Sequence, residues 1–251
     1  MIGSIKGMIM NAEYLKRQQE LIVEYIYRFS DKSDPNTEPI IDGIADESKY
    51  VESKFRIAWI LKEPYDEDDG SGGGWSLSKD LLSKQNLYSE VVGRSPTWQP
   101  MVYVTYSILN GFVSYSEMDY IRDDPEMAQC LNKICLVNIN KKPAFHRSND
   151  LEIGIKYQYW KPILFWQMKV YDPQIVIFGN TFQHFWEDMS INSDNIMHGD
   201  CVDYIATEKV LYISAYHPAQ TTITRDRYVN GIIDVIKNNI NKISCKPKSS
   251  L

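Results

Sequence analysis

Two side chains of contrasting chemistry follow short apolar runs of this chain. Glu63 comes after the run 55–61, and His217 comes after the run 210–214. Nearly continuous apolar runs of this length are typical of strands buried between helices. In open α/β sheets, ligands bind beyond the carboxyl ends of the strands. If these strands are parallel neighbours, both side chains face one cleft, where the carboxylate can stabilise positive charge and the histidine can hydrogen-bond to negative charge.

Two more apolar runs end in the same way. Residues 134–139 lead into Asn138-Ile139-Asn140, and residues 175–178 lead into Gly179-Asn180. The sequence therefore predicts four strands, each with a polar or glycine-containing exit.

Helical patterns alternate with these strands. A helix is predicted from Asn11, a candidate N-cap, to about Ser30, and another runs from Pro100 to Gly111. Residues 150–171 are mostly helical, with Pro162 expected to kink or divide them. A closing helix is predicted from the spacing of its apolar side chains, which are Val229, Ile232, Ile233, Ile236 and Ile240. The alternation predicts an α/β fold with three layers, α/β/α, around a central, mainly parallel sheet of about four strands.

The chain is expected to form one α/β domain over residues 1–251. Its parts are an N-terminal helix (about 11–30), an irregular surface segment (about 31–50) and a core (about 55–241). No apolar run approaches the roughly 20 residues of a membrane span, and no secretion signal is recognisable. We therefore expect a cytoplasmic monomer that does not enter membranes. The net charge of −6 argues against a non-specific nucleic-acid coat protein but leaves room for a local basic patch.

The cysteines and histidines do not form a metal-binding pattern. Cys130, Cys135, Cys201 and Cys245 include no Cys-x-x-Cys pair and are expected to be reduced thiols. His198-Gly199-Asp200-Cys201 is too crowded for a tetrahedral site. The glycine run 70–74 lacks the Lys-Ser/Thr ending of a phosphate-binding loop and favours a mobile flap. No metal and no cofactor are predicted.

The order of the strand exits resembles that of the uracil-DNA glycosylase superfamily. Glu63-Pro64-Tyr65 is similar to the Asp-Pro-Tyr that ends the family's first strand, Asn138 to an asparagine after a middle strand, and His217-Pro218 to a His-Pro pair after the last strand. The similarity spans about residues 55–228. It implies the three-layer fold of that family and a site at the strand exits.

The resemblance also implies roles for these residues. Glu63 would position water and stabilise the cationic sugar, Asn138 would bind the polar edge of the base, and His217 would hydrogen-bond a base oxygen. Tyr65 would border the base, and Trp75 would stack on it once it is flipped out of the helix. A carboxylate on the sugar side and a donor on the base side lower the barrier to cleaving the bond between them.

The chain departs from the family pattern at several positions. Glu63 replaces an aspartate, Lys62 a glutamine and Asp66 a histidine, and Ala219-Gln220 follows His217-Pro218 in place of a serine and a leucine wedge. Further along the chain, Ile223 is the candidate wedge, and Arg225 and Arg227 are the candidate DNA-phosphate contacts.

Structural explanations of the same residues stay open at this stage. Glu63 can be an exposed turn residue, Asn138 a turn-forming amide and His217 a hydrogen-bonded core histidine, while Trp75 can fold onto the core as a lid. The first hypothesis is a monofunctional DNA glycosylase acting on a deaminated or damaged, uracil-type base. The alternatives are a non-catalytic module of the same fold that binds a nucleobase, nucleic acid or another partner, and a hydrolase of free nucleosides.

Overall fold

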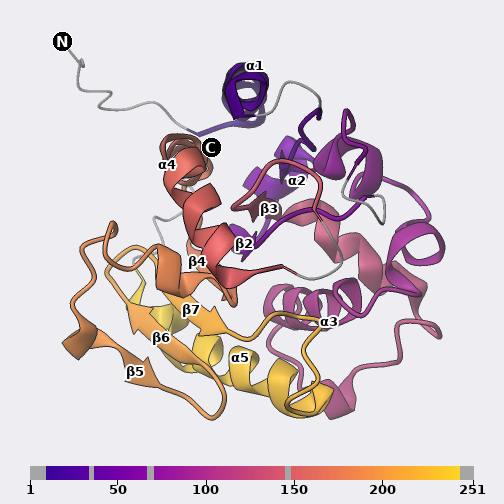
Figure 1. The fold of residues 1–251 in the computed structure, drawn as a ribbon. Helices are drawn as coiled ribbons and strands as arrows, with labels where there is room; N and C mark the ends of the chain where they lie inside the picture. The colour runs from indigo at the N-terminus through magenta and orange to yellow at the C-terminus, as the bar shows by residue number, and fades with distance from the viewer. Residues whose placement is uncertain (1–9, 34–36, 67–70, 145–147, 244–251) are drawn as a thin grey trace.

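A seven-stranded sheet runs through the centre of the computed structural model, which describes residues 10–33, 37–66, 71–144 and 148–243 (Figure 1). The strands are β1 (Gly43–Ile44), β2 (Ile57–Leu61), β3 (Cys135–Asn138), β4 (Ile175–Gly179), β5 (Met197–His198), β6 (Asp203–Ala206) and β7 (Leu211–Ala215). Their order across the sheet is β1-β3-β2-β4-β7-β6-β5.

The four predicted strands are present and adjacent. β3, β2, β4 and β7 pair in parallel, so that their carboxyl ends lie at one edge of the sheet. The sheet is larger than predicted and mixed, because β1 pairs antiparallel with β3 and because β6 and β5 extend the other side antiparallel. These additions are two to four residues long. Strands this short carry too few residues for an alternating pattern to stand out.

Helices cover both faces of the sheet, as predicted (Figure 1). Trp59 and Leu61 of β2 point to the face covered by α3 (Trp98–Leu109) and α5 (Arg225–Asn239). Ala58 and Ile60 point to the opposite face, which is covered by α1 (Ala12–Ser33) and α4 (Asp150–Tyr171). All five residues of β2 are buried, because the central strand is covered on both sides.

The prediction of an irregular surface segment over residues 31–50 is wrong for residues 40–50. Residues 40–45 are buried and include β1, and α2 (Glu47–Glu52) begins after Asp46, whose side chain accepts a hydrogen bond from the Lys49 N–H. The proline, aspartates and glycine of this stretch are turn signals, but three isoleucines lie among them. These isoleucines are buried in the core, which the turn signals obscured.

The predicted helices are present and differ from the prediction at Pro162. Asn11 caps α1, because its Oδ1 accepts a hydrogen bond from the Tyr14 N–H at 2.8 Å. α4 continues through Pro162 and is not divided, with buried Trp160 and Ile163 on either side of the proline packing into the core. In the part of the chain that the structure describes, no helix is both long and apolar enough to cross a membrane.

Candidate functional site

The exits of β2 and β3 run side by side beyond the sheet. The Ile139 N–H donates to the Leu61 carbonyl, and the Asn140 N–H donates to the Lys62 carbonyl, each at 2.9 Å. The Glu63 carboxylate then accepts a hydrogen bond from Asn140 Nδ2, with 3.3 Å between Nδ2 and Oε2. The parallel pairing thus extends past the strands and fixes Glu63 beside an amide that the sequence did not single out as a site residue.

The exits of β4 and β7 close against the end of β2. The Asn180 N–H donates to the Ala215 carbonyl at 2.8 Å. A Cβ added to Gly179 would lie 2.7 Å from the Leu61 side chain and 3.1 Å from that of Pro218. A larger residue would require the Leu61 side chain to shift, so Gly179 favours the close approach of Pro218 to the end of the central strand. The predicted convergence of the strand exits at one edge is observed.

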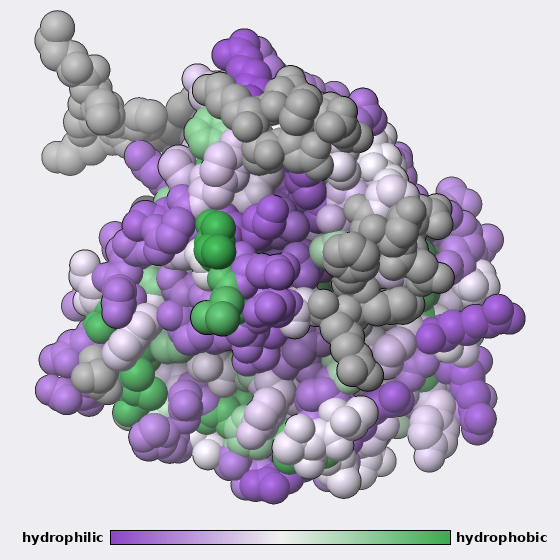
Figure 2. Space-filling model, viewed as in Figure 1, coloured by the Kyte–Doolittle hydropathy of each residue, from purple (hydrophilic) through white to green (hydrophobic). Residues whose placement is uncertain are grey.

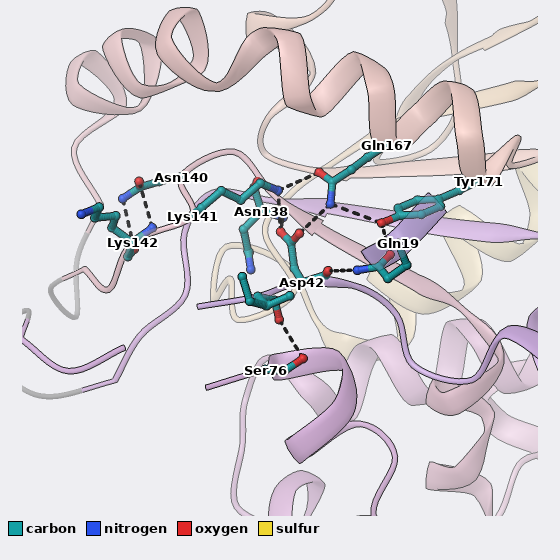
Figure 3. Close-up of polar contacts among 10 residues, drawn as sticks. Gln19, Asp42, Ser76, Asn138, Asn140, Lys141, Lys142, Gln167 and Tyr171 are labelled. Carbon is teal, nitrogen blue, oxygen red and sulfur yellow. Dashed lines mark hydrogen bonds and ion pairs between the residues drawn. The ribbon is translucent and has the colours of Figure 1, made fainter. Parts of the chain in front are cut away.

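Asn138 is buried at this edge, with only 2% of its surface exposed. Its side-chain nitrogen has no hydrogen-bond partner within the described part of the chain. Figure 3 shows this side chain pointing away from Gln167 and Tyr171, on the side of the sheet where Ser76 lies. A buried amide donor without a partner is costly, on the order of 1–3 kcal/mol, so the position is suited to an acceptor from outside the protein.

A fully buried ion pair lies directly behind Asn138. Lys141 Nζ is 2.7 Å from Asp42 Oδ2, and neither side chain is exposed. Gln167 joins both, accepting from Lys141 Nζ at 2.8 Å and donating to Asp42 Oδ1 at 2.7 Å. Burial lowers the pKa of Lys141, and the neighbouring Asp42 opposes that shift. The sequence did not indicate these three residues as part of a site. For Lys141, the polar run 140–142 directly after a buried strand was a usable signal.

His217 is held in one tautomer by the backbone. Its Nδ1 accepts a hydrogen bond from the Ala219 N–H at 3.2 Å, so the neutral ring carries its proton on Nε2. Burial lowers the pKa of His217 to about 4, and the positive charge of Lys62 contributes to the same shift. The ring is therefore neutral at pH 7 and offers one N–H donor, at Nε2.

We expect the neutrality of His217 to make stability depend on pH in a defined direction. The pKa of His217, about 4 in the folded state, lies below the value of about 6.5 in an unfolded chain. The unfolded state therefore takes up the proton first, and the stabilising effect that is present above pH 6.5 is lost as the pH falls toward 4, by up to about 3 kcal/mol. Urea unfolding of the wild type and His217→Gln should show a smaller difference in unfolding free energy at pH 4.5 than at pH 7.5. An equal difference at both pH values would contradict the assignment.

Lys62 connects the exit of β2 to the start of α4. Its Nζ is 2.5 Å from Asp150 Oδ1, and its side chain is mostly buried. His184 lies within the same electrostatic environment: burial lowers its pKa, while Asp150 raises it and Lys62 lowers it further. His184 ends a short helical turn after β4, Phe182–His184. The proximity of His184 to Lys62 and Asp150 results from the path of the chain after β4, which the structure shows and the sequence does not.

Trp75 is fixed by its neighbours on the other side of Asn138. Its indole N–H donates to Asp66 Oδ2 at 2.9 Å, and its carbonyl accepts from the Ile41 N–H at 2.9 Å. The glycine run was predicted to be a mobile flap, and its Gly70 lies outside the described residues. Gly73 and Gly74 are held in place by hydrogen bonds to Asp66 and to the backbone of residue 39. Asp66, a departure from the family pattern, thus organises the loop that carries Trp75.

The residues predicted to contact DNA differ in how they are engaged. Arg227 forms a two-pronged ion pair with Asp200, with distances of 2.7 and 2.9 Å, which neutralises its charge locally. Arg225 is exposed in the first turn of α5. Ile223 is partly buried, and both its N–H and its carbonyl are bound by the Gln220 side chain. Arg225 is thus better placed than Arg227 to contact a phosphate, and Ile223 is restrained.

Exposed nonpolar side chains border the same edge. Tyr65 and Tyr216, on the loops after β2 and β7, are both exposed. Leu151 and Ile155, one turn apart at the start of α4, are 81% and 70% exposed. Figure 2 shows hydrophobic side chains over α4 within a largely hydrophilic face.

Two cavities lie away from the strand exits. One of about 560 Å³ lies between the end of α4, β4, β6 and β7, and one of about 470 Å³ lies between α1 and residues 74–80. Neither is lined by Glu63, Asn138 or His217, although Trp75 lines the second. Within the described ranges, no group of three or more His, Cys, Asp or Glu side chains is arranged to hold a metal ion.

The comparisons with known proteins add no relative. No protein-family model matches the chain, and the search of curated proteins finds no match. The site is therefore interpreted from its own geometry.

Proposed function

We propose that this protein binds a uracil-type base at the carboxyl edge of its sheet and hydrolyses the N-glycosidic bond that joins the base to DNA. The observation that carries the proposal is a pair of donors: Asn138 Nδ2, which is buried without a hydrogen-bond partner among the described residues, and the Nε2–H that the neutral His217 ring carries. Both come from strands of one parallel set. Carbonyl oxygens of a pyrimidine are acceptors of the matching kind.

The proposed reaction uses charge at both ends of the bond. As the bond lengthens, the sugar gains positive charge and the departing base gains negative charge. Glu63 would orient water toward the sugar and stabilise its positive charge, and His217 would stabilise the base anion without transferring its proton. The Asn140 amide holds the Glu63 carboxylate, which favours one orientation of the acid.

The fold and the surface support a DNA substrate. Parallel strands between two helical layers match the architecture that the resemblance to uracil-DNA glycosylases implies. The exposed Tyr65 and Tyr216 rings offer stacking surfaces at the edge, which suits a base taken out of a helix or a single strand. Trp75 remains the candidate stacking wall for the flipped base.

A hydrolase of free nucleosides is the second candidate, and local charge favours it. Lys62, Lys141 and Arg227 are each paired with a carboxylate, which reduces the positive potential available to a phosphate backbone. A nucleoside needs the base-reading donors and the carboxylate but no basic groove.

Incubation with a uracil-containing single-stranded oligonucleotide is expected to release free uracil, with a rate that falls as salt rises. Deoxyuridine, at the same concentration of uracil, serves as the competing substrate. An oligonucleotide of the same sequence with thymine in place of uracil is the control for base specificity. Turnover of deoxyuridine alone would establish the second candidate, and no release from either substrate would overturn hydrolysis.

A further inference from the structure

Both peptide groups that flank the Cα of Asn138 are held by the buried residues behind it. The Asn138 N–H donates to Asp42 Oδ2 at 2.6 Å, and the Asn138 carbonyl accepts from Lys141 Nζ at 2.8 Å. Gln167 bonds the other oxygen of Asp42 and the same ammonium group. Fixing the peptide groups on both sides of one residue fixes the direction of its Cα–Cβ bond.

We propose that Asp42, Lys141 and Gln167 form a clamp that sets the direction of the Asn138 side chain and thereby determines how tightly the site binds its base. The three are positioning residues, since they act through Asn138. The inference rests on the proposed function for its purpose, whereas the clamp itself can be tested without any ligand. Figure 3 shows the three side chains converging behind Asn138.

The sheet topology explains why the Asn138 N–H is bound by the Asp42 side chain and not by the backbone of β1. β1 pairs with β3 through Gly43 and Ile44 and stops before it reaches Asn138. Gly43 has a φ of +128°, and a Cβ at this position would lie about 2.5 Å from the Gln19 side chain and 2.6 Å from the Tyr171 hydroxyl. The chain therefore turns at a position that only glycine can occupy, and the Asp42 carboxylate binds the Asn138 N–H that the strand leaves unpaired.

The clamp is also tied to two helices. Gln19 of α1 donates to the Asp42 carbonyl at 2.8 Å, and the Tyr171 hydroxyl at the end of α4 donates to Gln19. Gln167 belongs to α4 as well. The ion pair costs desolvation that a nonpolar pair would not, and a buried pair of this kind is weak evidence for a stabilising role. A role in orienting Asn138 explains why one charge lies at its N–H and the other at its carbonyl.

The test uses a variant in which both charges are removed, because a single change would leave one charge buried alone. Asp42→Leu/Lys141→Met removes both the acceptor of the Asn138 N–H and the donor to the Asn138 carbonyl, and it keeps the approximate size of the two side chains. Lys161→Met, which breaks the Lys161–Asp188 ion pair at the surface, is the matched control. Circular dichroism and thermal unfolding establish that each variant is folded.

The first measurement is amide hydrogen exchange, and it needs no ligand. In the double variant, the Asn138 amide should exchange at least about tenfold faster than in the wild type. The Ile139 amide is the internal control, since it donates to the Leu61 carbonyl and not to the clamp. Equal protection of Asn138 in the wild type and the double variant would overturn the clamp.

The second measurement is the affinity for free uracil, by calorimetry, in a double-mutant cycle with Asn138→Ala. Removing the clamp should weaken binding about tenfold when Asn138 is present and have no further effect when it is absent. Equal losses in both backgrounds would show a general structural effect and contradict the positioning role. If the wild type binds no uracil, the proposed function fails. Hydrogen exchange then still tests the clamp: faster exchange of the Asn138 amide in the double variant supports it, and unchanged exchange contradicts it.

Discussion

Glu63→Gln is expected to slow the release of uracil from an oligonucleotide by on the order of a hundredfold or more. Glutamine keeps the size of the side chain and its contact with Asn140, but it carries no charge to stabilise the sugar cation and cannot take a proton from water. Binding should change little, because the proposed contacts to the base come from Asn138 and His217. The loss should therefore appear in the single-turnover rate and not in the affinity.

Two comparison variants make this result specific to Glu63. Glu126→Gln changes an exposed acid far along the chain from the strand exits and should retain the wild-type rate. Glu63→Asp shortens the side chain to that of the aspartate in the family that the sequence resembles, and its rate shows whether the longer acid is matched to this site. If Glu63→Gln released uracil at the wild-type rate, Glu63 would have no role in hydrolysis.

Lys141→Met is expected to lower the unfolding free energy by about 3–5 kcal/mol. The substitution leaves the Asp42 carboxylate buried without its counter-charge, and it also removes donors to Asn138 and Gln167. Adding Asp42→Asn should recover much of the loss, because the remaining pair is neutral. Urea unfolding at pH 7.5 measures both quantities, provided that the slope of the transition is unchanged.

A surface ion pair gives the reference for this effect. Lys161→Met breaks a pair that is partly exposed to solvent, and such pairs contribute about 0–1 kcal/mol. If Lys141→Met cost no more than Lys161→Met, the buried charges would be dispensable to the fold.

The sequence predicted the central part of the fold because the parallel strands carry a strong signal. β2, β3, β4 and β7 are nearly continuous apolar runs, and the helices between them have regular spacing. β1 and β5 have two residues each, which is too short for any pattern. Their pairing depends on contacts with distant strands that no local window contains.

The candidate site was predicted in part. Glu63, Asn138 and His217 were expected at strand exits from the runs that precede them, and β2, β3 and β7 belong to one parallel set, although β4 separates β2 from β7. The sequence did not predict the groups that hold these side chains in place. They are the backbone N–H that sets the tautomer of His217, the Asn140 amide that donates to Glu63, and the charged side chains behind Asn138. Residue type indicates which groups a side chain offers, but tertiary contacts decide which of them remain unused.

The separation of these residues along the chain has a consequence for the order of events during synthesis. Asp42 and Asn138 are 96 residues apart, and Asp42 and Gln167 are 125 apart. β7 then adds beside β4, so His217 joins the edge only after residue 211 has been made. On a ribosome, the early segment with Asp42 must wait for most of the chain before its carboxylate is paired, and contacts of such long range form slowly. The proposed base site can therefore be complete only after β7 and the loop that carries His217 have been made.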